Sequence, residues 1–262
     1  MLRLMKTVLR SGFDRPQEII HLFVGGSELH GAKVGATDDL DIYGIFVCQP
    51  EEALGLVTRK HFVWSTATDD RRNGPEDIDL TLYSLHRWAQ LAAKGNPTAL
   101  HFLFADATSE SIELWQLIQS HRNLFVSKRS AEQCLGFAGN QLRRITGEKG
   151  RGAKGTRPEY EGIYGYDTKA AMHCLRLYLE CIELMRAGTI TLPRPEREYL
   201  IEVRSGQWTL EKFLDEAHKL ENEAKTATQD SLLPETADLG AISRLIAKVH
   251  LTAWKPCHEI AG

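Results

Sequence analysis

Residues 19–47 read IIHLFVGGSELHGAKVGATDDLDIYGIFV, and this stretch decides the fold. Residues 19–24 are a short run of β-branched and apolar side chains that ends at Gly25 and Gly26, a pattern typical of a buried strand followed by a tight turn. Residues 41–47 form a second run of the same kind. The stretch therefore predicts two strands whose connection begins with a glycine turn.

A third strand is predicted farther along the chain, at residues 77–83. The sequence DIDLTLY alternates strictly, so Asp77 and Asp79 fall on one face and the apolar side chains on the other. This alternation is typical of a half-buried strand. It therefore predicts a sheet with an acidic face.

The second half of the chain has the periodicity of helices. Ser130 and Gln133 form a capping box at the start of one of them. The predicted helices span residues 130–145, 167–187, 196–204, 210–225 and 238–250. We therefore expect an α/β (α+β) core with a mixed β-sheet over residues 1–115, followed by an all-α C-terminal domain over residues 116–262.

The composition excludes several classes of protein. Of the 262 residues, 42% are hydrophobic and 26% are charged, which excludes disorder along the whole chain. The formal net charge of -3 excludes a global attraction to nucleic acid or acidic lipid. The five cysteines form no C-x-x-C pair, which argues against zinc, and no run of about 18 apolar residues occurs. We expect a soluble, cytoplasmic protein with no membrane partner.

Two acidic side chains stand at the start of the second strand. Asp39 and Asp41 are separated by one residue, so in an extended segment their carboxylates share a face and repel each other. Mg²⁺ commonly takes one or two such carboxylates and leaves its other positions to water and phosphate. Asp79, on the other acidic strand, would supply a third carboxylate to a two-metal centre.

The alternative is a simple turn at Asp38 and Asp39, with Asp41 opening the strand. The upstream sequence favours the metal site. Gly26 and Ser27 follow a predicted strand, where backbone N–H groups and a hydroxyl can cradle a phosphate.

The predicted helix at residues 167–187 carries a narrow polar stripe. Lys169, His173, Arg176 and Glu180 fall on one side at about 100° per residue, and nearly every other direction is apolar. The apolar surround favours a stripe facing a water-filled cleft, where Lys169 and Arg176 would neutralise phosphate charge. The alternative is a solvated stripe held by an Arg176–Glu180 pair.

Residues 147–166 hold six glycines, four basic residues and three tyrosines between two predicted helices. A loop of this length inside a compact unit is usually functional or disordered. We expect a clamp that orders on a nucleotide, with Lys154 in contact with phosphate and the tyrosines stacking on bases. Disorder is the alternative.

These motifs resemble a known superfamily. Gly26-Ser27, then Asp39-x-Asp41 and a later acidic strand are similar to the nucleotidyltransferase superfamily typified by DNA polymerase beta. Longer strings resemble a bacterial and phage branch of predicted nucleotidyltransferases: GGSELHG (25–31), DLDIYGIF (39–46), YSL (83–85), KGNP (94–97) and YDTKAAMHCLR (166–176). Because the last string lies in the helical half, the resemblance extends over most of the chain.

The resemblance implies roles for individual residues. Gly26 and Ser27 would hold the β- and γ-phosphates of a nucleoside triphosphate such as ATP. Asp39 and Asp41 would hold two Mg²⁺ or Mn²⁺ ions. Asp79 matches the third carboxylate, which in this superfamily usually activates the acceptor hydroxyl and completes the metal site.

The matched string in the helical half implies that Lys169, His173 and Arg176 contact the nucleotide. Asp77 is a register alternative to the third carboxylate, since it shares the face of the strand. One departure from the branch is Asp38, which stands where serine is common and adds negative charge.

The activity expected from these features is metal-dependent transfer of a nucleoside monophosphate from a triphosphate to an acceptor hydroxyl, with release of pyrophosphate. An RNA or DNA end is the favoured acceptor. The alternatives are nucleotidylation of a protein or a small molecule, and a non-catalytic nucleotide-binding regulatory module. The sequence specifies neither the base nor the oligomeric state.

Overall fold

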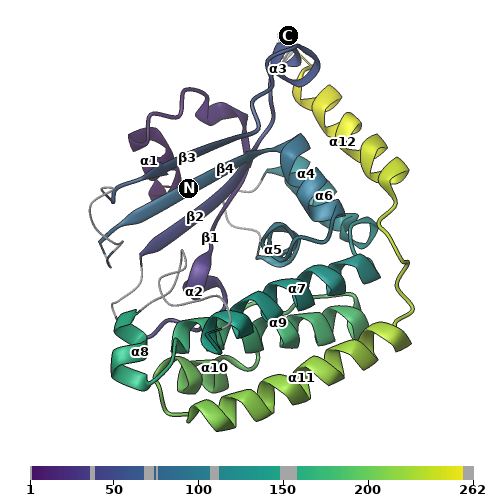
Figure 1. Cartoon of the computed structure of the whole chain (residues 1–262). Coiled ribbons are helices and arrows are strands. Elements are labelled where there is room, and N and C mark those ends of the chain that lie inside the picture. The colour runs from purple at the N-terminus through teal and green to yellow at the C-terminus, as the bar shows by residue number, and fades with distance from the viewer. Residues whose placement is uncertain are drawn as a thin grey trace.

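The computed structural model describes residues 2–35, 39–67, 74, 76–106, 112–147 and 158–255. Its four strands form one mixed sheet in the order β1-β2-β4-β3 (Figure 1). The strands are β1 (Ile19–Val24), β2 (Leu40–Phe46), β3 (His61–Ser65) and β4 (Ile78–Ser84). β2 runs antiparallel to β1 and parallel to β4, and β3 lies antiparallel to β4 at the edge.

The parallel pairing of β2 with β4 decides where the acidic residues lie. Asp41 stands opposite Asp79, and the next residue of β2, Ile42, stands opposite Leu80. Paired residues on neighbouring strands share a face of the sheet, and the face alternates along each strand. Ile42 and Leu80 are buried on one face, so the two aspartates lie together on the other.

The two faces of the sheet pack against different helices. Ile42 and Leu80 join a buried cluster with Val8 of α1 (Leu2–Arg10). Ile45, on the acidic face, joins a larger cluster that continues through the helices of the second half of the chain. The sheet is thus enclosed by α1 on one side and by the later helices on the other (Figure 1).

In the described chain, helices precede, separate and follow these strands. After α1 they are α2 (Gly26–Leu29), α3 (Pro50–Leu54), α4 (Leu85–Ala93), α5 (Pro97–Phe104), α6 (Glu113–Ser120), α7 (Lys128–Ile145), α8 (Pro158–Tyr164), α9 (Thr168–Ala187), α10 (Arg197–Arg204), α11 (Leu210–Asp230) and α12 (Leu239–Ala253). α9 packs between α7 and α11, and α12 packs on α4 (Figure 1). The fold class is confirmed: a mixed sheet with a helical C-terminal region.

Two sequence-based expectations about helices are wrong. α7 begins at Lys128, with Ser127 at its N-cap, so Ser130 lies inside the first turn and forms no capping box. The backbone N–H of Ser130 donates a hydrogen bond to the carbonyl of Ser127. Gly95 packs so closely on this turn that a Cβ on Gly95 would lie 2.6 Å from the Cα of Ser130. The segment at 147–166 is not loop throughout, because α8 occupies its second half.

The division into residues 1–115 and 116–262 stays a prediction. The larger buried cluster includes side chains from β1 and β2 together with side chains from α4 to α7 and from α9 to α12. Among the helices of the described residues, none combines the length and the apolar character needed to cross a lipid bilayer.

Candidate active site

A glycine turn after β1 brings the chain directly against β2. Gly26 has a φ of +58°, and a Cβ at this position would lie 2.0 Å from Oδ2 of Asp41. At Gly25 a Cβ would lie 2.2 Å from Cδ2 of Tyr43. These distances are far below van der Waals contact, so the turn reaches Asp41 only because both positions lack a side chain.

Three carboxylates meet beside this turn. Asp41 and Asp79 are register partners on β2 and β4, and Asp39 directly precedes β2. Each residue offers a carboxylate oxygen, and these oxygens lie within 4.8 Å of one another. All three side chains are half-buried. Carboxylates at this separation repel one another, and hard oxygen ligands of this kind suit Mg²⁺ or Mn²⁺, so the donor set fits a divalent ion.

Asp77 does not belong to this group. It precedes β4, and its carboxylate accepts hydrogen bonds from Oγ1 of Thr66 at 3.1 Å and from the backbone N–H of Gly74 at 2.7 Å. It is buried at 3% exposure and holds the connection between β3 and β4. In the structure Asp79, and not Asp77, lies with Asp39 and Asp41, because the Asp77 carboxylate is hydrogen-bonded to residues between β3 and β4. Asp38 lies outside the described residues.

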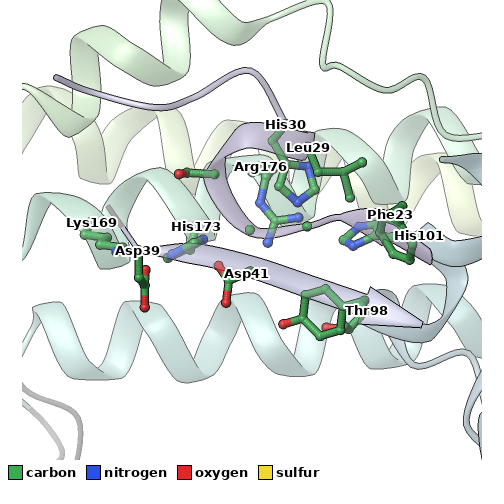
Figure 2. Close-up of a pocket in the computed structure, with 14 residues that line it drawn as sticks. Phe23, Leu29, His30, Asp39, Asp41, Thr98, His101, Lys169, His173 and Arg176 are labelled. Atoms are coloured by element: carbon green, nitrogen blue, oxygen red, sulfur yellow. The ribbon is translucent and has the colours of Figure 1, made fainter. Parts of the chain in front are cut away.

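A pocket of about 320 Å³ opens beside the carboxylates (Figure 2). The predicted site residues that line it are Gly26, Ser27, Asp39, Asp41, Lys169, His173 and Arg176. Figure 2 shows Lys169, His173 and Arg176 in sequence along one wall, with Asp39 and Asp41 beside them. The structure thus brings cationic side chains of α9 beside Asp39 and Asp41 at the start of β2. Lys154 lies outside the described residues.

The last member of the polar stripe, Glu180, is completely buried below the pocket. Its Oε1 accepts a hydrogen bond from Nη1 of Arg176 at 2.7 Å and lies 3.3 Å from Nδ1 of His30. Its Oε2 lies 3.0 Å from Nε2 of His101. The stripe therefore combines both expectations: it lines a pocket, and it contains the Arg176–Glu180 pair, but the pair is buried rather than solvated.

The charges in this buried group follow from their surroundings. Burial alone would raise the pKa of Glu180, but Arg176 and the two histidines hold it well below its usual value. Burial and the charge of Arg176 lower the pKa of His30 well below its usual value. Burial, reinforced by Asp41, raises the pKa of Tyr43 above its usual range. Glu180 is therefore anionic, and His30 and Tyr43 are neutral, near neutral pH.

Sequence reasoning missed the contribution of α5 to the pocket. Thr98 and His101, one turn apart on this helix, both line it. The sequence contains a helix-start signal, Asn96 followed by Pro97. In the structure Asn96 is the N-cap of α5 and accepts a hydrogen bond from the backbone N–H of Ala99, and Pro97 lies in the first turn. An Asn-Pro helix start predicts that residues three apart, such as 98 and 101, share a face.

The chain is similar to two known proteins, each over part of its length. The chain is 29% identical over 157 residues to an uncharacterized 38.9 kDa protein in the nrdC-mobD intergenic region of Enterobacteria phage T4, a match that covers 58% of this chain and 41% of the phage protein. The chain thus spans about two fifths of that relative's length. A nucleotidyltransferase-like protein from Exiguobacterium sibiricum 255-15 shares 13% identity at a TM-score of 0.31, covering 87% of this chain and 74% of the other.

A family described as "RNA repair pathway DNA polymerase beta family" (RlaP) matches residues 3–249, nearly the whole chain. The match includes the glycine turn, the three carboxylates and the polar side of α9. The chain therefore belongs to the RNA repair pathway DNA polymerase beta family, a branch of the nucleotidyltransferases.

Proposed function

We propose that the protein is a divalent-metal-dependent nucleotidyltransferase that transfers a nucleoside monophosphate from a nucleoside triphosphate to a hydroxyl group at an RNA end. One observation carries the proposal: the carboxylates of Asp39, Asp41 and Asp79 converge within 4.8 Å beside a pocket that Lys169 and Arg176 also line. The family description names an RNA repair pathway, which supports RNA over DNA, protein and small molecules as the acceptor.

The three carboxylates would hold the metal ions. Asp39 and Asp41 face the pocket and would bind both Mg²⁺ ions, and Asp79 would complete the site from the neighbouring strand. When bound, two such ions stabilise the charge on the attacking and leaving oxygens of a phosphoryl displacement. The carboxylates of this chain fix where that charge is neutralised.

The triphosphate would lie between the glycine turn and α9. Gly26 and Ser27 line one side of the pocket, and Lys169, His173 and Arg176 line the other. The two cationic side chains would neutralise phosphate charge, which is the ordinary requirement of phosphoryl transfer. The buried Glu180 holds Arg176 by a hydrogen bond of 2.7 Å, so the guanidinium enters the reaction already oriented.

In the proposed reaction the acceptor oxygen forms a bond to the α-phosphorus, and the bond from that phosphorus to the bridging oxygen of pyrophosphate breaks. Asp79 would accept the proton of the attacking hydroxyl. The displaced pyrophosphate would leave along the wall formed by Lys169 and Arg176.

The test follows a labelled α-phosphate. The protein is incubated with each α-labelled nucleoside triphosphate, Mg²⁺, and an RNA oligonucleotide, the same sequence as DNA, or an RNA whose terminal hydroxyl is blocked. We expect label on the RNA with a free hydroxyl and none on the blocked RNA.

Asp41→Asn provides the decisive variant because it removes one ligand charge without changing the shape of the side chain. We expect it to reduce transfer to background. Glu76→Gln, an exposed carboxylate just before β4 that is not part of the cluster, should retain full transfer. Full transfer by Asp41→Asn would contradict the proposal, and nucleotide binding without transfer to any acceptor would show a binding module instead.

A further inference from the structure

A second chamber of about 200 Å³ adjoins the first on its helical side. The residues that line both spaces are Thr98, His101, His173 and Arg176. Beyond this shared wall the second chamber is lined by Pro97, Phe137, Gln141 and Leu177. Together the two spaces fall in the size range of small-molecule sites, about 300–1,000 Å³.

The two chambers differ in chemical character. The first contains Asp39, Asp41 and the glycine turn, whereas the described residues that line the second include no carboxylate. The second instead offers an aromatic ring, aliphatic surface and a carboxamide. A nucleoside triphosphate has the same asymmetry, since its phosphates are charged and its base is flat and uncharged.

We propose that the second chamber binds the base of the incoming nucleoside triphosphate, with Phe137 stacking on the base and Gln141 contacting its edge. This inference rests on the proposed function and extends it to a part of the cleft that the metal site does not use. It also assigns substrate recognition to α7, a helix that follows the last strand of the sheet in the chain.

Phe137 has the exposure that a stacking residue needs. It lies on α7 with 39% of its surface exposed, although aromatic side chains of this size are mostly buried in the cores of proteins. A ring at the edge of a chamber offers one face to a base, and every base has a face that stacks. Stacking therefore provides affinity without choosing among bases.

Gln141 provides the polar contact, and its orientation is fixed. Its Oε1 accepts a hydrogen bond from Nη1 of Arg144 at 3.0 Å, and Nη2 of Arg144 lies 3.3 Å from Oδ2 of Asp167. An arginine only donates hydrogen bonds, so the oxygen of Gln141 must face Arg144 and the amide NH₂ group is the end left to donate elsewhere. A donor held in this way favours acceptor atoms on the edge of a base.

The incoming nucleotide fits this chamber better than the acceptor does. Arg176 and His173 line both chambers, so a triphosphate held on this wall places its base within reach of the second chamber. Asp79, the carboxylate assigned to the acceptor side, lines neither chamber among the described residues. The acceptor would therefore approach from the β4 side of the metal site.

The test compares the binding of nucleotides with the binding of inorganic tripolyphosphate, which has the charge but no base. Dissociation constants for all four nucleoside triphosphates and for tripolyphosphate are measured with Mg²⁺ by calorimetry. Phe137→Ala should weaken all four nucleotides by about 5- to 150-fold and leave tripolyphosphate unchanged. Phe137→Trp should retain nucleotide affinity, and Gln141→Ala should change the order of preference among the four bases.

Leu210→Ala is the matched control, because this apolar side chain on α11 is 38% exposed and lines neither chamber as described. It should bind every ligand as the unmodified protein does. Unchanged nucleotide affinity in Phe137→Ala, or an equal loss of affinity for tripolyphosphate, overturns this inference and leaves the proposed function standing. The RNA oligonucleotide is titrated in the same way. If Phe137→Ala loses RNA binding while its nucleotide binding is intact, the chamber belongs to the acceptor and the inference is overturned. An unmodified protein that binds neither nucleotide nor tripolyphosphate overturns the proposed function as well.

Discussion

Replacing Gly26 with alanine tests whether the glycine turn exists to make room for a metal ligand. The residue has a φ of +58°, and its new Cβ would lie 2.0 Å from Oδ2 of Asp41. The left-handed backbone alone costs about 1–2 kcal/mol for a residue with a side chain. The collision is with the far end of a side chain, so we expect Asp41 to rotate away rather than the fold to break.

Gly12→Ala separates the two effects. Gly12 has a φ of +80°, and a Cβ there meets nothing within 4 Å. Both variants should therefore lose about 1–2 kcal/mol of unfolding free energy, measured by urea denaturation. Only Gly26→Ala should also lose affinity for Mn²⁺, by about tenfold or more, because the rotated Asp41 no longer faces Asp79.

The readout is Mn²⁺ binding by calorimetry on both variants under the same conditions. Equal Mn²⁺ affinity in the two variants would refute the reasoning, since it would mean that the approach of the turn to Asp41 has no bearing on the metal. Complete unfolding of Gly26→Ala, with Gly12→Ala still folded, would also refute the reasoning. It would mean that the clash is relieved by the backbone and not by rotation of Asp41.

Three further predictions concern stability. Glu180→Gln leaves the buried guanidinium of Arg176 without a counter-charge and should lower the unfolding free energy by about 3–5 kcal/mol, measured by urea titration. Glu223→Gln breaks the exposed pair with Arg186 and should change the unfolding free energy by less than about 1 kcal/mol. Burial lowers the pKa of His21 to about 3, so below about pH 6.5 the folded state binds fewer protons than the unfolded state. The unfolding free energy should therefore decrease as the pH is lowered from about 6.5 toward 3, by up to about 1.4 kcal/mol per pH unit. His21→Phe should flatten this slope, and an unchanged slope would contradict the lowered pKa of His21. Trp254→Phe removes the hydrogen bond of 2.8 Å from Nε1 to the carbonyl of Cys48, and the unfolding free energy should fall by about 1 kcal/mol. An unchanged unfolding free energy would mean that this hydrogen bond, which joins the end of α12 to the residues after β2, does not stabilise the fold.

The sequence predicted the strands of the site because their signals are local. β1, β2 and β4 were each located to within one residue, since burial on at least one face imposes a readable pattern. The ends of α9 were equally clear: the side chain of Asp167 accepts from the backbone N–H of Ala170, and Gly188 follows with a φ of +66°. Each of these features depends on residues within one turn of chain.

What the sequence could not predict depends on contacts between distant segments. β3 has alternating half-buried and exposed residues at the edge of the sheet, so its burial pattern is weak. Asp77 and Asp79 have the same position in the alternation, and only the connection through Thr66 and Gly74 separates them. The burial of Glu180 likewise depends on His30 and on α5, which are far from it in sequence.

The account depends most on the three carboxylates acting as one divalent-metal site. The most direct measurement is the stoichiometry and affinity of Mn²⁺ by electron paramagnetic resonance, with a non-hydrolysable nucleoside triphosphate present, for the unmodified protein, Asp79→Asn and Glu76→Gln. The account predicts two bound ions in the unmodified protein and in Glu76→Gln, and fewer or weaker ones in Asp79→Asn. Binding that is absent from all three proteins, or that is the same in Asp79→Asn as in the unmodified protein, would contradict it.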